Sequence, residues 1–278
     1  MAILYIVATP IGNLEDISLR ALRTLHEVRL IACEDTRYTR RLLRTYDIST
    51  PVTSYHEHNK RDKTEFILAQ LAQGDVALVS DSGTPGISDP GPELVASASQ
   101  QGFPVVSIPG ASVVTAAMAV SGLSTDRFIF LGFLPHKSSG RKRVLKSVAD
   151  EEGTIVLLES PHRLPASLKD MLFVLGDRQI AVCRELTKIY EEVFRGNISQ
   201  AITHFSEPKG EFTLVISGRS EEKVKINVGQ DIKARLAEMQ VAGVSVKDAI
   251  MLAGDTKVSR KDMYQAWLSL KKSGEGES

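Results

Sequence analysis

Residues 74–91, GDVALVSDSGTPGISDPG, contain the feature that decides the fold, a buried strand that opens into a long loop. The apolar run Val76–Ser80 is typical of a strand that is covered on both faces. The loop after it carries three glycines and two prolines, and it is about twice as long as the usual connection between a strand and a helix. Glycine lets the backbone approach a ligand closely, and proline stiffens the loop. We therefore interpret this loop as part of a ligand site rather than as a plain turn.

The sequence on both sides of this loop alternates between short apolar runs and helical periodicity. The predicted strands are Ile3–Ala8, Val28–Cys33, Val52–Tyr55, Val76–Ser80 and Val105–Ile108. The predicted helices are Ser18–His26, Tyr38–Tyr46, Lys63–Gln73 and Glu93–Gln101. This alternation predicts an α/β fold whose parallel sheet is covered on both faces and binds ligands beyond the carboxyl ends of its strands.

A second lobe and a helical tail are expected after this first lobe. Ala111–Ser121 has the composition of a buried linking helix. The next predicted strands are Arg127–Phe133, Thr154–Leu158, Gln179–Cys183, Glu192–Arg195 and Phe212–Ser217. The third and fourth of these are close enough to form a hairpin, which predicts a mixed sheet. Tail helices are predicted at Asp231–Gln240, Val246–Ala253 and Ser259–Leu270, with Ser245 and Ser259 as N-caps. We predict lobes at residues 1–118 and 119–220 and a small helical module at 225–278.

Composition points to an ordinary globular protein of the cytoplasm. Hydrophobic residues make up 42% of the 278 residues and charged residues 24%, which is enough for a sizeable core. No apolar run reaches the roughly 18 residues of a membrane span, and the N-terminus lacks the basic start of a signal peptide. Cys33 and Cys183 have no metal-ligand spacing and are expected to be buried and reduced. His56 and His58 alternate at a strand end, and we assign no metal to them.

Positive charge is concentrated in two short segments although the formal net charge is zero. Residues 37–44, RYTRRLLR, carry four arginines and no acid, and residues 136–146, HKSSGRKRVLK, carry five Lys and Arg residues and no acid. A solvated helix face explains most single runs of this kind. Two runs beside candidate site loops favour a polyanionic partner, whereas the zero net charge argues against bulk electrostatic binding of nucleic acid.

Two further loops follow predicted strands. Residues 8–18, ATPIGNLEDIS, lack both the dinucleotide fingerprint and a phosphate-binding lysine. Residues 108–117, IPGASVVTAA, end a strand and begin a helix, so Ser112 either helps to hold a carboxylate or is a simple N-cap.

The order and spacing of these three loops resemble the tetrapyrrole methylases, which bind S-adenosylmethionine between two α/β lobes. The resemblance covers about residues 2–218 and implies S-adenosylmethionine as cofactor. It implies these cofactor contacts: Pro10, Asp81, Ser82, Gly83, Thr84, Ile87, Ser112, Val113, Glu159, Leu186, Phe212 and Thr213. One departure is that porphyrin enzymes carry an aspartate where this chain has Thr84, which puts the role of Asp81 in doubt.

Six motifs resemble a narrower group, the small-subunit ribosomal RNA methyltransferases I. They are CEDTRYTRRLL, TSYHEHN, SDSGTPGISDPG, ESPHR, RELTKIYEE and GEFTLVISG. This resemblance implies methylation of the ribose 2′-hydroxyl of a cytidine in the decoding region of 16S rRNA. It also implies a homodimer whose partner is 16S rRNA or the small ribosomal subunit, with no role for DNA or a membrane.

The residues themselves offer several candidates for the chemistry. A ribose hydroxyl becomes a good nucleophile when its proton is removed, and the candidate bases are Asp35, Glu159, His162 and Glu185. Candidate RNA contacts are Arg37, Arg40, Arg41, Arg141, Lys142, Arg143, Arg163 and Lys188. Each has a structural alternative. Glu159 could only line the pocket, His162 and Arg163 could cap a helix, and Glu185 could form an ion pair with Lys188.

Two other functions are compatible with the same sequence. A porphyrin or corrin C-methyltransferase would share the cofactor loops, but the basic segments and the last motifs argue against it. A non-catalytic ribosome assembly factor would explain the helical tail, but the intact cofactor loops argue against that.

Overall fold

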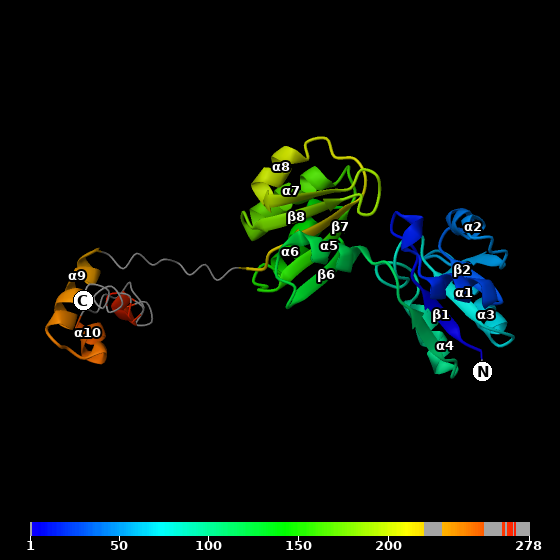
Figure 1. Ribbon diagram of the computed structural model, residues 1–278, viewed down its shortest axis with the longest axis horizontal. Helices are drawn as coiled ribbons and strands as arrows, with labels where there is room; N and C mark the ends of the chain where they lie inside the picture. Colours follow the sequence, from blue (N-terminus) through cyan, green and yellow to red (C-terminus); the bar gives the residue numbers. More distant parts are fainter. Residues whose placement is uncertain (1, 220–229, 253–262, 265, 269, 271–278) are drawn as a thin grey trace. The chain divides into compact units, whose positions relative to one another are not determined.

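The computed structural model describes residues 2–219, 230–252, 263, 264, 266–268 and 270 (Figure 1). The contacts divide the chain into two units, Met1–Arg219 and Ser220–Ser278. The predicted limits 1–118, 119–220 and 225–278 stay predictions. Among the described residues, no helix is both long enough and apolar enough to cross a bilayer.

The first unit begins with a five-stranded sheet in which every pairing is parallel, as predicted. The strands are β1 (Leu4–Val7), β2 (Leu30–Cys33), β3 (Val52–Ser54), β4 (Val76–Val79) and β5 (Val105–Ile108), in the order β3-β2-β4-β1-β5. The helices are α1 (Leu19–Glu27), α2 (Thr36–Thr45), α3 (Lys60–Leu71), α4 (Pro92–Gln100) and α5 (Val113–Ser121). All residues of β2 and β4 are buried, which explains why their sequences are continuously apolar.

The second sheet of this unit is mixed, which confirms the hairpin prediction. Its strands are β6 (Phe128–Phe133), β7 (Thr154–Glu159), β8 (Gln179–Arg184), β9 (Glu192–Asn197) and β10 (Phe212–Ile216), in the order β6-β7-β10-β8-β9. Only β6 and β7 pair in parallel. Three helices belong to this part, α6 (Ser138–Ser147), α7 (Leu164–Leu175) and α8 (Ile198–His204).

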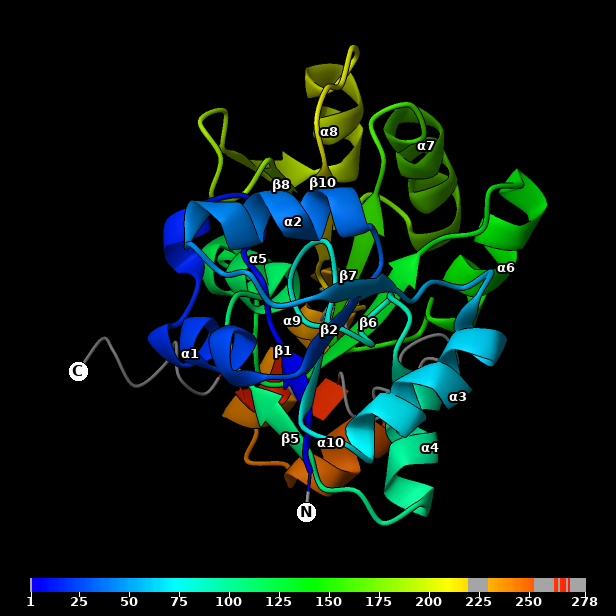
Figure 2. The same cartoon turned by 90° about the vertical axis from the view of Figure 1, so that its right-hand side faces the viewer.

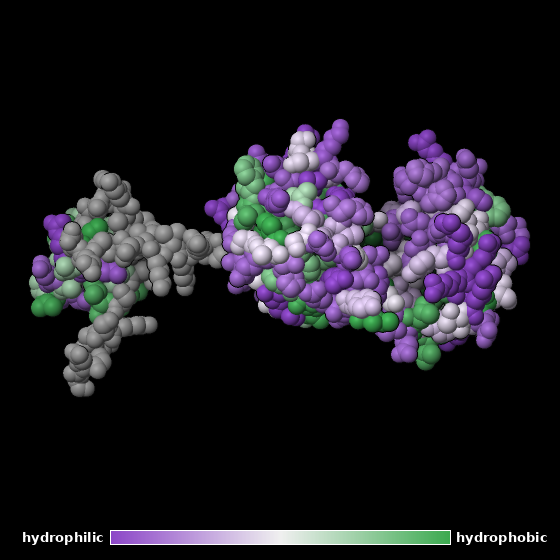
Figure 3. Space-filling model, turned by 90° about the horizontal axis from the view of Figure 1, so that it is seen from above, coloured by the Kyte–Doolittle hydropathy of each residue, from purple (hydrophilic) through white to green (hydrophobic). Residues whose placement is uncertain are grey.

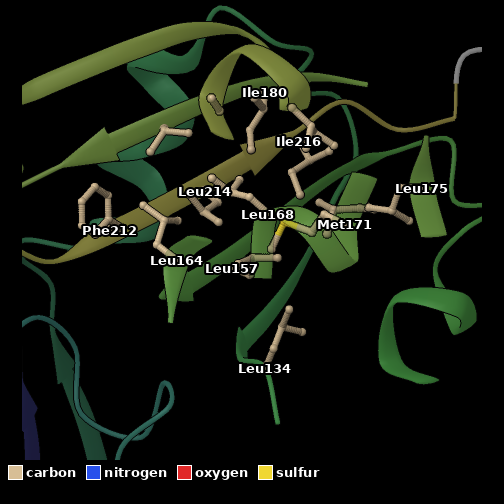
Figure 4. Packing of buried hydrophobic residues seen from close by; sticks show 14 of the residues in the cluster. Leu134, Leu157, Leu164, Leu168, Met171, Leu175, Ile180, Phe212, Leu214 and Ile216 are labelled. Atoms are coloured by element: carbon tan, nitrogen blue, oxygen red, sulfur yellow. The ribbon is translucent and has the colours of Figure 1, made fainter. Parts of the chain in front are cut away.

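Apolar side chains cover both faces of the second sheet. On one face, Leu157 and Leu214 pack with Leu168 and Met171 of α7 (Figure 4). On the other face, helix α5 packs its Ala117 and Met118 into a cluster with strand residues of β7, β8 and β10. Helix α5 therefore joins the end of the first sheet to the face of the second, and the two sheets form one compact unit.

The second unit contains α9 (Gln230–Val241) and α10 (Val246–Leu252). Its core brings together Leu236, Ala249, Ala266 and Trp267. The Asp248 amide donates a hydrogen bond to the Ser245 hydroxyl at 3.3 Å, as expected of an N-cap. Residues 263, 264, 266–268 and 270 are helical, and the predicted cap Ser259 lies outside the described residues.

Candidate active site between the two sheets

A cavity of about 350 Å³ lies between the two sheets of the first unit. Figure 3 shows the molecule hollowed there. Loops after β1, β4 and β5 form one wall, and the ends of β7, β8 and β10 contribute to the other. All but two of the predicted cofactor residues line it: Ser82, Gly83, Thr84, Ile87, Ser112, Val113, Glu159, Leu186, Phe212 and Thr213. The two others, Pro10 and Asp81, line a neighbouring cavity of about 260 Å³.

The glycine- and proline-rich loop is fixed to the first loop by backbone hydrogen bonds. The Thr9 amide donates to the Gly83 carbonyl at 2.9 Å, and the Gly83 amide donates to the Thr9 carbonyl at 3.1 Å. The Ser80 hydroxyl also donates to the Gly83 carbonyl, at 3.1 Å. Gly83 has a φ of +79°, a conformation that favours glycine over residues with a Cβ. The sequence therefore needs glycine here to turn the loop into the cavity.

Ser112 occupies the N-cap position of α5, but its side chain makes no capping hydrogen bond. Instead, Ser112 lines the cavity together with Val113 and Val114. The positive end of the helix dipole is directed at the same region and favours an anionic group there. Of the two interpretations of this residue, the geometry favours the ligand contact over the simple cap.

Glu159 is a buried carboxylate at the end of β7. It accepts hydrogen bonds from the Ser167 hydroxyl at 2.5 Å and from the Ser160 amide at 2.9 Å, and Arg163 Nε lies 3.1 Å away. These contacts hold it rigidly in the cavity wall. The neighbouring Ser160 hydroxyl is buried without a hydrogen-bond partner among the described residues, although it belongs to the cavity lining. A buried hydroxyl of this kind requires a partner, which a ligand can provide.

Glu185 lies in the same wall as Glu159, in a strained loop after β8. Glu185 has a φ of +49° and Thr187 a φ of +68°, so the backbone is held in conformations that are costly for both residues. Burial raises the pKa of Glu185, but hydrogen bonds from the Glu211 amide and from Lys188 outweigh it, and the pKa is lowered overall. Lys188 bridges Glu185 at 3.0 Å and Glu211 at 2.8 Å. Glu185 is therefore an ionised, paired carboxylate.

The two other candidate bases lie outside the cavity lining. Asp35 caps α2 through the Arg37 amide and pairs with the Arg37 guanidinium at 2.6 Å. The hydrogen bond from the Arg37 side chain lowers the pKa of Asp35 to about 2. His162 is exposed in the turn before α7. The lowered pKa of Asp35 does not suit a group that removes a proton near neutral pH, and His162 stays a prediction.

The sequence did not single out Asp89, which the structure places in the cavity lining. Burial, followed by the nearby carboxylates of Glu34 and Asp81, raises the pKa of Asp89 to about 6. Its position in the SDPG segment of the ligand loop was the only signal in the sequence. Burial and neighbouring charge depend on the fold, so the sequence alone did not reveal them.

Several predicted RNA contacts are engaged within the protein. Arg141 is buried and pairs with Asp170 at 2.7 Å, and it also donates to the His136 carbonyl. Its prediction as an RNA contact is corrected, because its guanidinium faces the interior. Lys142 lies 3.5 Å from Asp170. Seven basic residues of the two segments are exposed: Arg37, Arg40, Arg41, Arg44, Lys137, Arg143 and Lys146.

Arg163 and Lys188 do not line the cavity, but each contacts a carboxylate that does, Glu159 and Glu185 respectively. Arg163 donates to the Leu134 carbonyl and neighbours Glu159, while Lys188 bridges two carboxylates. His56 and His58 contact each other edge to face at 6.0 Å between ring centroids. In the described part of the chain, no cluster of three metal-binding side chains occurs.

Comparison with known proteins agrees with this geometry. Residues 3–202 match the family described as Tetrapyrrole (Corrin/Porphyrin) Methylases. The chain is 48% identical to a Synechocystis sp. protein named Ribosomal RNA small subunit methyltransferase I, over 99% of this chain and all of the relative. It is 50% identical to a Thermotoga maritima protein of the same name, over 79% of this chain and all of the relative. The fold is similar to that of uroporphyrin III C-methyl transferase from Thermus thermophilus, with a TM-score of 0.59, 18% identity and coverage of 78% and 97% of the two chains.

Proposed function

Because the chain belongs to the tetrapyrrole (corrin/porphyrin) methylase family, we propose that it is an S-adenosylmethionine-dependent methyltransferase of small-subunit ribosomal RNA. Within this proposal, the acceptor is the ribose 2′-hydroxyl of a cytidine in the decoding region of 16S rRNA. The main support for the proposal is one cavity that is lined both by the loops after three strands of the first sheet and by strand ends of the second sheet. The similarity of nearly the whole chain to proteins named Ribosomal RNA small subunit methyltransferase I supports the acceptor.

The cavity has the features that S-adenosylmethionine requires. Ser112 and the N-terminus of α5 favour the carboxylate of the methionine part. The unpartnered Ser160 hydroxyl offers a hydrogen bond, and Phe212 and Leu186 provide apolar surface for the adenine. When bound, S-adenosylmethionine supplies an electrophilic methyl group. Ile11 and Gly83, from the first two loops, both line this cavity.

The acceptor hydroxyl must lose its proton during transfer. Of the carboxylates in the cavity lining whose pKa is shifted, Glu185 has a lowered pKa, whereas that of Asp89 is raised to about 6. A base whose pKa lies just below the working pH is both ionised and able to accept a proton. Asp89 therefore has the pKa that suits the proton acceptor best, and Glu159 serves to position the wall through its contact with Ser167.

The remaining features of the proposal concern the assembly. The family resemblance supports a homodimer in the cytoplasm, with RNA rather than DNA as partner. We also assign to the helical tail a role in holding RNA, since its core is separate from that of residues 1–219. Light scattering coupled to gel filtration tests the dimer, and a mass equal to one chain contradicts it.

Nucleoside mass spectrometry tests the acceptor directly. Ribosomal RNA from cells that lack the protein is compared with rRNA from cells that contain it. We expect one ribose-methylated cytidine in the small-subunit RNA to depend on the protein. An unchanged methylation profile, with methyl transfer to a porphyrinogen in vitro, would instead establish the tetrapyrrole alternative.

A further inference from the structure

The neighbouring cavity of about 260 Å³ contains two of the predicted cofactor contacts, Pro10 and Asp81, but none of the residues that line the first cavity. The first loop contributes Thr9, Pro10, Gly12 and Leu14 to its lining, and Asp81 lies at the end of β4. Helix α2 contributes its own residues, which are Tyr38, Arg41 and Leu42. This second cavity therefore lies between the first loop and the helix that carries the arginine-rich segment.

The two cavities are adjacent, because residues next to each other in the sequence line one or the other. Along the first loop, Pro10 and Gly12 line the second cavity, whereas Ile11 between them lines the first. At the end of β4, Asp81 lines the second cavity and Ser82 lines the first. A group bound in the second cavity is therefore next to whatever occupies the first. Because methyl transfer needs the reacting atoms to approach to about 3–3.5 Å, the ribose of a nucleotide held in the second cavity must extend past these loop residues into the first.

Internal contacts hold the walls of the second cavity in place without a ligand. The Tyr46 hydroxyl, just beyond α2, donates to the Leu14 carbonyl at 2.6 Å and ties the first loop to the helix. The Asp35 amide donates to the Asp81 carboxylate at 3.1 Å and ties β4 to the start of the same helix. The site is therefore preorganised, which reduces the entropy lost on binding.

Its side chains match the parts of a nucleotide. Tyr38 and Arg41 are three residues apart in α2, the helix labelled in Figure 2, and this spacing places them on one face of it. Tyr38 is 54% exposed, so its ring is free to stack on a base. Among the residues that the structure describes, no carboxylate lies within ion-pair distance of Arg41, so its guanidinium is free for a phosphate. The Asp81 carboxylate accepts hydrogen bonds from hydroxyl or amino groups.

We propose that the second cavity receives the acceptor nucleotide of the RNA, with its base against Tyr38 and a phosphate on Arg41. This inference rests on the proposed function. An enzyme that modifies one nucleotide of a folded RNA must extract that nucleotide from its neighbours and hold it in a pocket. The second cavity provides an aromatic surface, a cation and a hydrogen-bond acceptor beside the cofactor cavity. Tyr38 and Arg41 are thus residues that bind the acceptor nucleotide.

The test measures methyl transfer to small ribosomal subunits with four variants of the full-length protein. Tyr38→Ala removes the ring, whereas Tyr38→Phe keeps it. Arg41→Gln removes a charge from the cavity, and Arg44→Gln removes the same charge from the same helix outside the cavity lining. We expect Tyr38→Ala and Arg41→Gln to raise the KM for the subunit about tenfold or more. Tyr38→Phe and Arg44→Gln are expected to stay within about twofold of the unmodified protein, and S-adenosylmethionine affinity in calorimetry is expected to be the same in all four.

Two outcomes would overturn the inference alone. The first is an unchanged KM in Tyr38→Ala, and the second is an equal loss in Arg44→Gln and Arg41→Gln, which would indicate a diffuse charge effect. Both occur in a protein that still methylates the subunit, so the proposed function survives them. A protein that methylates no small-subunit RNA overturns the proposed function and this inference together.

Discussion

Thr9 and Gly83 exchange two backbone hydrogen bonds, at 2.9 Å and 3.1 Å, although they are 74 residues apart in the sequence. The pair joins the loop after β1 to the loop after β4. Thr9 lines the second cavity and Gly83 lines the first. The two loops therefore act as one rigid element. A change in either loop is expected to affect ligand binding more than folding.

Gly83→Val tests this element. The positive φ of Gly83 strains any residue with a Cβ by about 1–2 kcal/mol. The displaced loop should then lose S-adenosylmethionine binding in calorimetry. Gly102→Val is the matched control, because Gly102 has a similar φ of +81° and a Cβ added there would meet no atom within 4 Å. We expect similar losses of unfolding free energy in both variants and loss of binding in Gly83→Val alone. Normal affinity in Gly83→Val removes this loop from the site.

Asp89→Asn tests the raised pKa through stability. The folded pKa of about 6 lies above the ordinary value near 4, so the folded protein holds the proton more tightly than the unfolded chain. The resulting stabilisation is fully present below about pH 4 and is lost as the pH rises through 6. Asparagine cannot ionise, so at pH 8 the variant should be more stable by about 1 kcal/mol after discounting for solvent screening, or about 2–4 °C in Tm.

The stability gain in Asp89→Asn should shrink toward pH 4, and methyl transfer should fall about 100-fold. Glu207→Gln, at an exposed position, serves as the control and should show no such pH dependence. If Asp89→Asn is less stable than the unmodified protein at pH 8, burial does not destabilise the ionised Asp89 carboxylate as we infer.

Removal of the second unit, Ser220–Ser278, tests whether the cofactor binds to the first unit alone. A chain that ends at Arg219 keeps all residues of both cavities, so its S-adenosylmethionine affinity should be unchanged. Its affinity for small-subunit RNA or its activity should fall. Loss of cofactor binding in a truncated chain with an intact circular dichroism spectrum contradicts the assignment.

Within the basic segment at residues 136–146, we expect substitutions of exposed residues to weaken RNA binding and a substitution of the buried Arg141 to lower stability. Arg143→Gln with Lys146→Gln removes exposed charge, so RNA binding should weaken and its salt dependence should flatten by up to about two units in slope. Arg141→Gln instead leaves Asp170 buried without its main partner and should cost about 3 kcal/mol of stability. Filter binding at several salt concentrations and thermal unfolding separate the two. If the two variants change RNA binding and thermal stability equally, the ion pair of Arg141 with Asp170 is not a main source of stability.

The sequence by itself determined both sheets and the loops that form the site. Burial on both faces leaves a continuous apolar run, so β2 and β4 were recognisable without any structure. The hairpin of β8 and β9 followed from the short spacing of two runs. The resemblance to the tetrapyrrole methylases implied ten of the residues that line the first cavity, and the strand–helix alternation placed the ligand loops at the carboxyl ends of the parallel strands.

Only the tertiary structure decided which charges are free to act. Arg141 and Arg143 belong to the same basic run, yet one pairs with Asp170, 29 residues away, and the other is exposed. Lys188 is neutralised by Glu211, and Asp89 acquires its raised pKa from burial and from Glu34 and Asp81. Tyr38 became a site residue only when α2 was placed beside the first loop. Secondary structure depends on neighbours along the chain, whereas the electrostatics of a site depend on solvent exclusion and on partners that folding brings together.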